Sequence, residues 1–317
     1  MIASTALLKT PRILSLTQPD SDSLAPAMLL WRRNFLLIKA ATNALPNTTS
    51  NNDAVQMLPA LQNRQWFEEC LRHSPVKALR LDMALGETTL RGWANVCDRT
   101  KKRVFVHLPA ATHLPKHSTP LLWRFKRFAD WVVAAGLTVG LSPLFILVAV
   151  LVRLDSPGSI FFRQWRVGHR GQLFQILKFR TMQPGSELRH HQVMGQQSGI
   201  HKLKKDPRVT GIGQILRKYS LDELPQLLNV LRGEMSLVGP RPWALYDAVR
   251  LEPAFRRRLN ALPGLTGAWQ VTARSHDCDL ASVSRIDLDY LQHWRVQTDL
   301  KFLLLTLPKV VSGFGAY

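Results

Sequence analysis

The sequence WVVAAGLTVGLSPLFILVAVLV, residues Trp131 to Val152, decides how this chain is organised. It runs for 22 residues without a charged side chain. As a straight helix it would be roughly 33 Å long, which is enough to cross the hydrocarbon of a bilayer. Arg127 precedes it, Arg153 follows it, and tryptophan at its start suits the membrane interface. The segment therefore predicts a helix that enters a membrane.

Ser142 and Pro143, at the centre of this segment, allow two interpretations. Proline removes a backbone donor and clashes with the carbonyl four residues earlier, so the helix must kink or break there. A kinked helix that spans the bilayer is the simpler interpretation. The alternative is a re-entrant hairpin with both ends on the cytoplasmic side, which the basic residues at both ends would suit. The hydroxyl of Ser142 could satisfy a carbonyl freed at the break. These residues alone leave both interpretations open.

The composition limits the kinds of partner. The chain has 317 residues, 46% of them apolar, which is enough for one or two domains with a packed core. Lys and Arg exceed Asp and Glu by 42 − 22 = 20, an excess that favours lipid headgroups, phosphorylated substrates or nucleic acid. The scattered cysteines Cys70, Cys97 and Cys278 argue against a disulfide framework and a zinc cluster. We expect no cleaved signal peptide, because no basic and apolar leader opens the sequence.

An adjacent carboxylate pair stands in residues 217–233, RKYSLDELPQLLNVLRG. Leucines form one helical stripe, and Pro225 is tolerated only in a first turn, so the helix should begin near Ser220 to Asp222. Asp222 and Glu223 would then lie at its positive end. Two such carboxylates favour a cation such as Mg²⁺, and an ionised aspartate can attack phosphorus. The simpler alternative is that Ser220 or Asp222 caps the helix and Glu223 completes a capping box.

Several cationic side chains accompany the carboxylates. Arg241 lies in VGPRP, residues 238–242, where prolines on both sides fix its backbone. Its guanidinium is a planar fork of donors that matches phosphate oxygens. Any one arginine is more often a solvated surface residue, so the hypothesis of a phosphate site depends on their number. The other candidates are Arg217, Arg274, Lys178 and Arg180.

The pattern divides the chain into five regions. Residues 28–38 are a strand candidate, helices are expected over 65–73 and 87–98, and strands over 76–81 and 103–108. This order predicts a parallel strand pair without a glycine-rich phosphate loop. The regions are a poorly patterned segment (1–62), a small α/β unit (63–109), a linker (110–122), the membrane helix (123–153) and a catalytic region (154–317).

Six blocks stand in this order along the chain from residue 126 onward: KRFAD (126–130), the central Ser142-Pro143, KFRTM (178–182), DPRVT (206–210), residues 220–242 and PGLTGAWQV (263–271). They are similar, in sequence and in order, to those of bacterial monotopic phosphoglycosyl transferases, also called polyprenyl glycosylphosphotransferases. The resemblance covers about Trp123 to Tyr317. Residues 259–264 and the C-terminal GFGAY are most similar to cyanobacterial members tied to heterocyst envelope polysaccharide.

The resemblance implies a reaction and a topology. Asp222 would attack a UDP-sugar, form a covalent phosphosugar intermediate and displace UMP, with Glu223 assisting through Mg²⁺ or a proton. Undecaprenyl phosphate would accept the phosphosugar, as the first membrane step of exopolysaccharide or envelope polysaccharide synthesis. The Ser142-Pro143 break would make the helix re-entrant, so the catalytic domain would lie on the cytoplasmic face of the cytoplasmic membrane. The residues expected to hold phosphates are Arg217, Arg241 and Arg274.

The expected fold is α+β: a monotopic membrane protein with a re-entrant helix and a mainly helical catalytic domain, preceded by a small α/β unit. Residues 1–119 depart from the family, since large members carry four spanning helices there and small members carry nothing. Two alternatives stay open, a non-catalytic basic protein that binds membrane or nucleic acid and a conventional glycosyltransferase that releases UDP. The expected partners are a UDP-sugar, undecaprenyl phosphate and membrane lipid, with no nucleic acid, because no recognised module is present. The sugar and the oligomeric state, a homodimer included, are left open.

Overall fold

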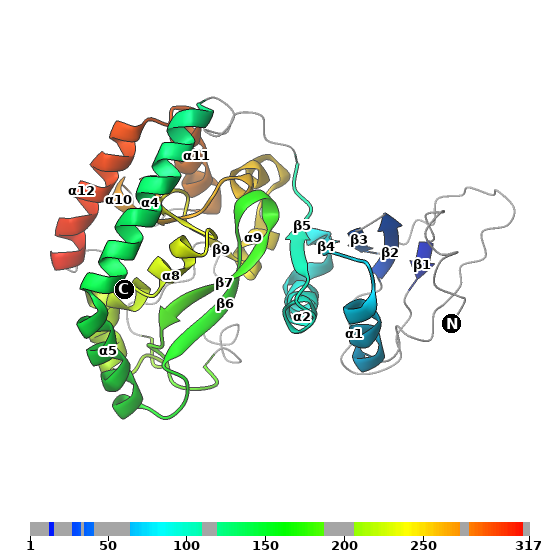
Figure 1. Ribbon diagram of the computed structural model, residues 1–317, viewed down its shortest axis with the longest axis horizontal. Coiled ribbons are helices and arrows are strands. Elements are labelled where there is room, and N and C mark those ends of the chain that lie inside the picture. The colour runs from blue at the N-terminus through cyan, green and yellow to red at the C-terminus, as the bar shows by residue number, and fades with distance from the viewer. Residues whose placement is uncertain are drawn as a thin grey trace, which may run out of the picture. The chain divides into compact units, whose positions relative to one another are not determined.

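The computed structural model describes residues 13–15, 27–32, 35–40, 64–109, 119–186, 206–272 and 279–312. The chain forms two compact units (Figure 1). The first is built mainly from residues up to His107, and the second mainly from Leu108 onward.

The first unit is a five-stranded sheet with helices α1 and α2 between its strands. Neighbours in the sheet follow chain order, antiparallel from β1 to β3 and parallel from β3 to β5. The predicted parallel pair is thereby confirmed as β4 and β5. The elements are β1 (Ile13–Ser15), β2 (Ala27–Arg32), β3 (Phe35–Ala40), α1 (Arg64–His73), β4 (Ala78–Leu81), α2 (Gly86–Arg99) and β5 (Arg103–Val106).

Residues 28–38, predicted as one strand, form two. Arg32 pairs with Phe35, so the chain reverses between β2 and β3. A single strand of that length would extend far beyond β4, which has 4 residues, and would leave backbone groups unpaired. β3 continues the sheet by pairing in parallel with β4. Part of the segment expected to lack pattern therefore belongs to the sheet of the small α/β unit.

The apolar segment lies in two helices, α4 (Pro120–Gly140) and α5 (Ser142–Asp155). They are bent by 62° relative to each other, which confirms the predicted break. In the described part of the chain no single helix is long and apolar enough to cross a membrane, whereas this bent pair together meets that criterion. Both helices expose large apolar side chains, among them Phe125, Phe128, Val139, Ile146 and Leu154.

The side chain of Ser142 compensates for the backbone donor that Pro143 lacks. In a regular helix the amide of residue 143 would donate to the carbonyl of Val139, and proline has no such amide. The Ser142 hydroxyl donates to that carbonyl oxygen instead, at 2.7 Å. The predicted use of the serine hydroxyl is confirmed.

The second unit packs its helices around two small sheets. β6 lies between β7 and β9 in one sheet, and β8 pairs in parallel with β10 in the other. Buried residues of α4, β7, α8, β8 and α12 share one apolar core, which includes Ala134, Ile176 and Leu227. The remaining elements are β6 (Phe161–Val167), β7 (Leu173–Phe179), α7 (Gly211–Lys218), α8 (Gln226–Leu231), β8 (Ser236–Val238), β9 (Trp243–Ala244), α9 (Leu245–Arg250), β10 (Gly264–Thr266), α10 (Ala268–Thr272), α11 (Leu280–Gln292) and α12 (Val296–Ser312).

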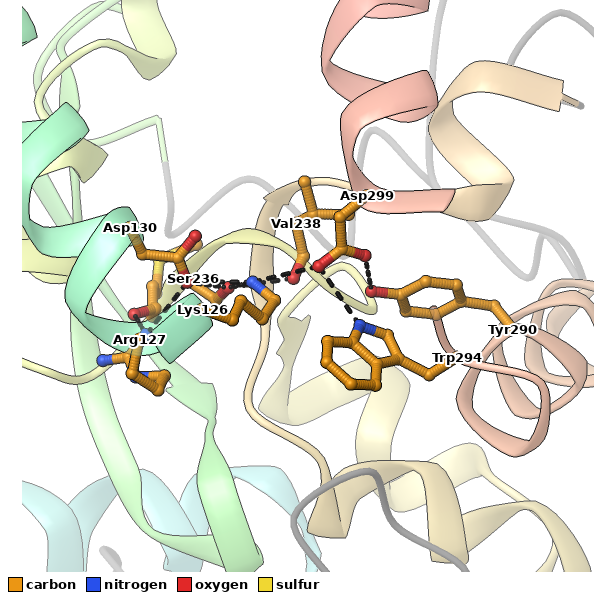
Figure 2. A network of polar contacts seen from close by, with 9 residues as sticks. Lys126, Arg127, Asp130, Ser236, Val238, Tyr290, Trp294 and Asp299 are labelled. Carbon is orange, nitrogen blue, oxygen red and sulfur yellow. Dashed lines mark hydrogen bonds and ion pairs between the residues drawn. The ribbon is translucent and has the colours of Figure 1, made fainter. Parts of the chain in front are cut away.

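A buried polar network ties α4 to β8, α11 and α12 (Figure 2). The ammonium of Lys126 lies 2.9 Å from the carboxylate of Asp130 and 3.3 Å from that of Asp299. It also donates to the hydroxyl of Ser236 at 2.5 Å, and Tyr290 donates to Asp299 at 2.6 Å. Because a buried charge is costly unless it is paired, this network fixes the base of α4 against the elements that follow it.

Candidate active site

The carboxylate pair lies in a short turn between two helices. α7 ends before Ser220, whose backbone is left-handed with φ of 54°. Leu221–Glu223 then form one 3₁₀ turn, closed by a bond of 3.2 Å from the Glu223 amide to the Ser220 carbonyl. The α-helix begins only at Gln226, so the predicted start near Ser220 to Asp222 is wrong. Pro225 lies just before that helix, where the backbone donor that proline lacks is not needed for a helical hydrogen bond.

The capping interpretation of the pair does not hold. The side chain of Ser220 makes no capping hydrogen bond, and the N-cap position of α8 is occupied by Pro225. Oε1 of Glu223 accepts hydrogen bonds from two cationic side chains, those of Lys178 and Arg241. The carboxylates therefore face charged groups from other elements.

Three segments bring these charges together. Lys178 comes from β7, the carboxylates from the turn, and Arg241 from the loop after β8. Nζ of Lys178 lies 2.7 Å from Oε1 of Glu223 and 3.8 Å from Oδ2 of Asp222. Nη2 of Arg241 donates to the same Glu223 oxygen at 2.8 Å. Glu223 is thus neutralised by two cations, whereas Asp222 has the more distant contact.

The pKa values of the two carboxyl groups shift in opposite directions. Burial raises the pKa of Asp222, and the charge of Glu223 adds to that rise, while Lys178 and two arginines oppose it. Burial also acts to raise the pKa of Glu223, but Arg241 and Lys178 together hold it well below its usual value. The two cations therefore favour the ionised form of Glu223, and Asp222 is the more basic carboxylate of the pair.

Arg217 belongs to the same charged cluster, as its position one turn before the carboxylates predicted. Burial lowers the pKa of its guanidinium, and the field of Asp222 acts in the opposite direction. Its Nε donates to Oγ1 of Thr181 at 2.9 Å. Thr181 is not among the predicted site residues, although it directly follows Arg180 in KFRTM.

Arg180 has its hydrogen bonds at the end of α5 and not at the carboxylate pair. Nη2 of Arg180 donates to the carbonyls of Val152 and Ser156, at 3.3 Å and 2.6 Å, and to the hydroxyl of Ser156 at 2.8 Å. Carbonyls at the end of α5 lack helical partners, which is why a cation suits this place. These bonds hold the end of α5, and the predicted phosphate contact of Arg180 stays a prediction. Arg274 lies outside the described residues, so its assignment stays a prediction.

The chemistry of the pair fits a magnesium ion that is shared with a substrate. Among the described residues, no three His, Cys, Asp or Glu side chains form a group that could hold a metal by themselves. Mg²⁺ commonly takes only one or two protein carboxylates and completes its shell with substrate phosphates and water. Asp222 and the second oxygen of Glu223 would supply such ligands.

Comparison with known proteins identifies the class. Residues 121–313 match the family described as bacterial sugar transferase, and these residues make up more than half of the chain. The chain therefore belongs to this family of enzymes. The match begins after the first unit, for which it assigns no role.

Proteins of several bacteria are similar to this chain, and each match covers nearly the same share of it. The exopolysaccharide production protein ExoY of Sinorhizobium fredii is 42% identical over 199 residues, 61% of this chain and 88% of the relative. The UDP-glucose:undecaprenyl-phosphate glucose-1-phosphate transferase of Caulobacter vibrioides is 43% identical over 203 residues, 61% and 72% of the two chains. The galactosyl transferase CpsE of Streptococcus agalactiae is 40% identical over 200 residues, 60% and 43%. The finer resemblance to heterocyst-associated members stays a prediction.

Proposed function

We propose that this enzyme transfers a sugar phosphate from a UDP-sugar to undecaprenyl phosphate through a covalent intermediate on Asp222, with release of UMP. The reaction would begin the synthesis of an exopolysaccharide or envelope polysaccharide. Membership of the bacterial sugar transferase family supports the class, and relatives named as undecaprenyl-phosphate transferases support the lipid acceptor.

The observation that carries the choice of nucleophile is the unequal neutralisation of the two carboxylates. Glu223 shares one oxygen with Lys178 at 2.7 Å and with Arg241 at 2.8 Å, and this withdraws its electron density. Asp222 lies 3.8 Å from its cationic neighbour and has a raised pKa, so its ionised form is the better nucleophile. Glu223 is better suited to hold the cations that meet the phosphates.

The reaction consists of two displacements at one phosphorus atom. A carboxylate oxygen of Asp222 attacks the β-phosphorus of the UDP-sugar, the bond from that phosphorus to the bridging oxygen breaks, and UMP leaves with the electron pair. An oxygen of undecaprenyl phosphate then attacks the phosphorus on Asp222. The bond to Asp222 breaks, the carboxylate is restored, and a lipid diphosphosugar is formed.

Phosphoryl transfer depends mainly on positioning and on neutralising the phosphate oxygens. Arg241, Lys178 and Arg217 surround the carboxylates and would bind the diphosphate. Mg²⁺, when bound with the diphosphate, would supply further neutralisation of its oxygens. The buried setting strengthens each of these contacts because little water competes there.

We also propose that α4 and α5 enter one leaflet and return to the same face. The apolar part of α4 from Trp131 and the 14-residue α5 would measure roughly 15 Å and 21 Å. Either is shorter than the hydrocarbon thickness of about 30 Å, and the 62° bend prevents them from acting as one straight span. The site would then lie at the cytoplasmic face. Cysteines introduced beside Trp123 and Asp155 should both be labelled only from that side, and labelling from opposite sides would contradict the re-entrant arrangement.

Covalent labelling tests the reaction directly. Purified protein is incubated with Mg²⁺ and a UDP-sugar whose β-phosphorus is radioactive, without acceptor, and protein-bound label is measured. We expect label on the wild type, none on Asp222→Asn, and normal label on Asp289→Asn, a control carboxylate whose side chain is 76% exposed. Label should leave the protein as lipid product when undecaprenyl phosphate is added. UDP as the only nucleotide product, or a wild type that never becomes labelled, would refute the proposal.

A further inference from the structure

Arg258 lies behind the loop that carries Arg241, and its burial needs an explanation. The side chain is 1% exposed, although a buried arginine is costly to desolvate. Its Nη2 donates to the backbone carbonyl of Arg241 at 3.1 Å and forms an ion pair with Asp287 of α11. The guanidinium also stacks over Trp243, with its carbon 4.3 Å from the ring centroid. One buried cation therefore connects α11 to the backbone of a predicted phosphate-binding residue.

Stability alone does not explain this ion pair. Nε of Arg258 and Oδ1 of Asp287 have no hydrogen-bond partner within the described part of the chain. Burial raises the pKa of Asp287, while Arg258 and a backbone hydrogen bond from Trp269 act in the opposite direction. Apolar residues of similar volume are often as stable as a buried ion pair. An apolar residue, however, could not donate to the Arg241 carbonyl.

The whole loop is held by donors and acceptors from its surroundings. Prolines precede and follow Arg241, so the loop has few backbone donors of its own. The amide of Gly239 donates to the Thr266 carbonyl, and the amide of Gly264 donates to the Pro240 carbonyl, both at 2.9 Å. Nη1 of Arg166 donates to the carbonyl of Pro242 at 3.2 Å. The carbonyl of Arg241, between those of the two prolines, accepts from Arg258.

We propose that Arg258, held by Asp287, is a positioning residue of this enzyme, because it fixes the backbone of Arg241 and so directs that guanidinium at the carboxylates and the diphosphate. The proposal rests on the proposed role of Arg241 in binding phosphate. Arg258 itself faces the back of the loop and touches the backbone there. Its loss should therefore misdirect Arg241 while the rest of the charged cluster stays in place.

A pair of substitutions separates positioning from folding. Arg258→Met or Asp287→Leu alone leaves a buried charge without its partner, so each should lower the thermal midpoint. The double variant removes both charges and should recover a midpoint near that of the wild type. We expect its kcat for lipid product to stay about tenfold or more below the wild type, with a smaller change in KM for the UDP-sugar, because Arg241 lacks its support. The control Arg257→Met changes the adjacent, exposed arginine and should leave both quantities unchanged.

The outcomes are decisive in each case. A double variant that recovers both stability and kcat would show that the ion pair serves folding alone and would overturn the proposal. If the double variant does not fold, Arg258→Lys decides, since its ammonium cannot serve Asp287 and the Arg241 carbonyl with the geometry of a planar fork. A folded Arg258→Lys with wild-type kcat would also overturn it. Failure of the wild type to become labelled at Asp222 would instead refute the proposed covalent route, and lipid product formation would still test the positioning role.

Discussion

Replacing Gly267 by alanine tests how closely the loop that carries Arg241 must be held. A Cβ atom on Gly267 would lie 2.1 Å from the carbonyl oxygen of Gly239 and 3.1 Å from its carbonyl carbon. Ordinary contact begins at 3.4 Å, so the Gly239 carbonyl must move by about 3.4 − 2.1 = 1.3 Å. Gly239 stands two residues before Arg241. A misplacement of about 1 Å in a catalytic group can cost on the order of 100-fold in rate, and we expect a loss of kcat of that size.

The assay measures lipid-linked product from a UDP-sugar and undecaprenyl phosphate, normalised to folded protein. Gly211→Ala is the matched control, because a Cβ atom there would meet only Asp155 Oδ1 at 3.9 Å, an ordinary contact. The control should turn over at the wild-type rate. Gly267→Ala with near wild-type kcat would refute the reasoning, since it would mean that the backbone can yield at Gly239 without disturbing Arg241.

Three further substitutions test single charges. Asp222→Asn should abolish turnover yet match or exceed the wild type in thermal midpoint at neutral pH. Because the pKa of Asp222 is raised in the folded state, its ionisation makes the fold less stable as the pH rises above the ordinary pKa of an aspartate. Asparagine cannot ionise, so this destabilisation is absent from the variant. A clearly lower midpoint would contradict this reasoning. Arg241→Lys should reduce kcat because one ammonium cannot reproduce a planar fork, and unchanged kcat and KM would count against a phosphate role. Asp206→Asn should be less stable than the wild type at neutral pH, because the ion pair with Arg208 lowers the pKa of Asp206 in the folded state. The stability that this carboxylate contributes is lost as the pH falls through its folded-state pKa. Denaturation across a pH series should show wild type and variant converging in acid, and a constant difference would argue against the ion pair.

Local chemistry made parts of this structure predictable. Pro143 cannot continue the hydrogen bonds of a helix, and Ser142 offers a hydroxyl beside the carbonyl that is left, so both the break and its compensation follow from two residues. The adjacency of Asp222 and Glu223 likewise implied nearby cations, and Lys178 and Arg241 are there.

Tertiary contacts decided the rest. Lys178 and Arg180 belong to one motif, and alternation along a strand would place both on the same side. β7 ends at Phe179, however, so Arg180 leaves the pleat and turns to the end of α5. Nothing in FRRRLN marks Arg258, rather than either arginine before it, as the buried one, because its partner Asp287 is 29 residues away.

The arrangement around Glu223 bears on why two carboxylates would be needed in the proposed reaction, which uses only one of them as the nucleophile. Before a diphosphate binds, the carboxylates of the site are the anions that Lys178 and Arg241 contact among the described residues. Glu223 takes that place, with one oxygen between the two cations. Asp222 is thereby kept from a close ion pair that would reduce the nucleophilicity proposed for it, and the cations would stay directed at the region where phosphate oxygens would arrive. A diphosphate can then share these cations without a large movement of protein groups, which is the condition under which electrostatic stabilisation of a transition state is most effective.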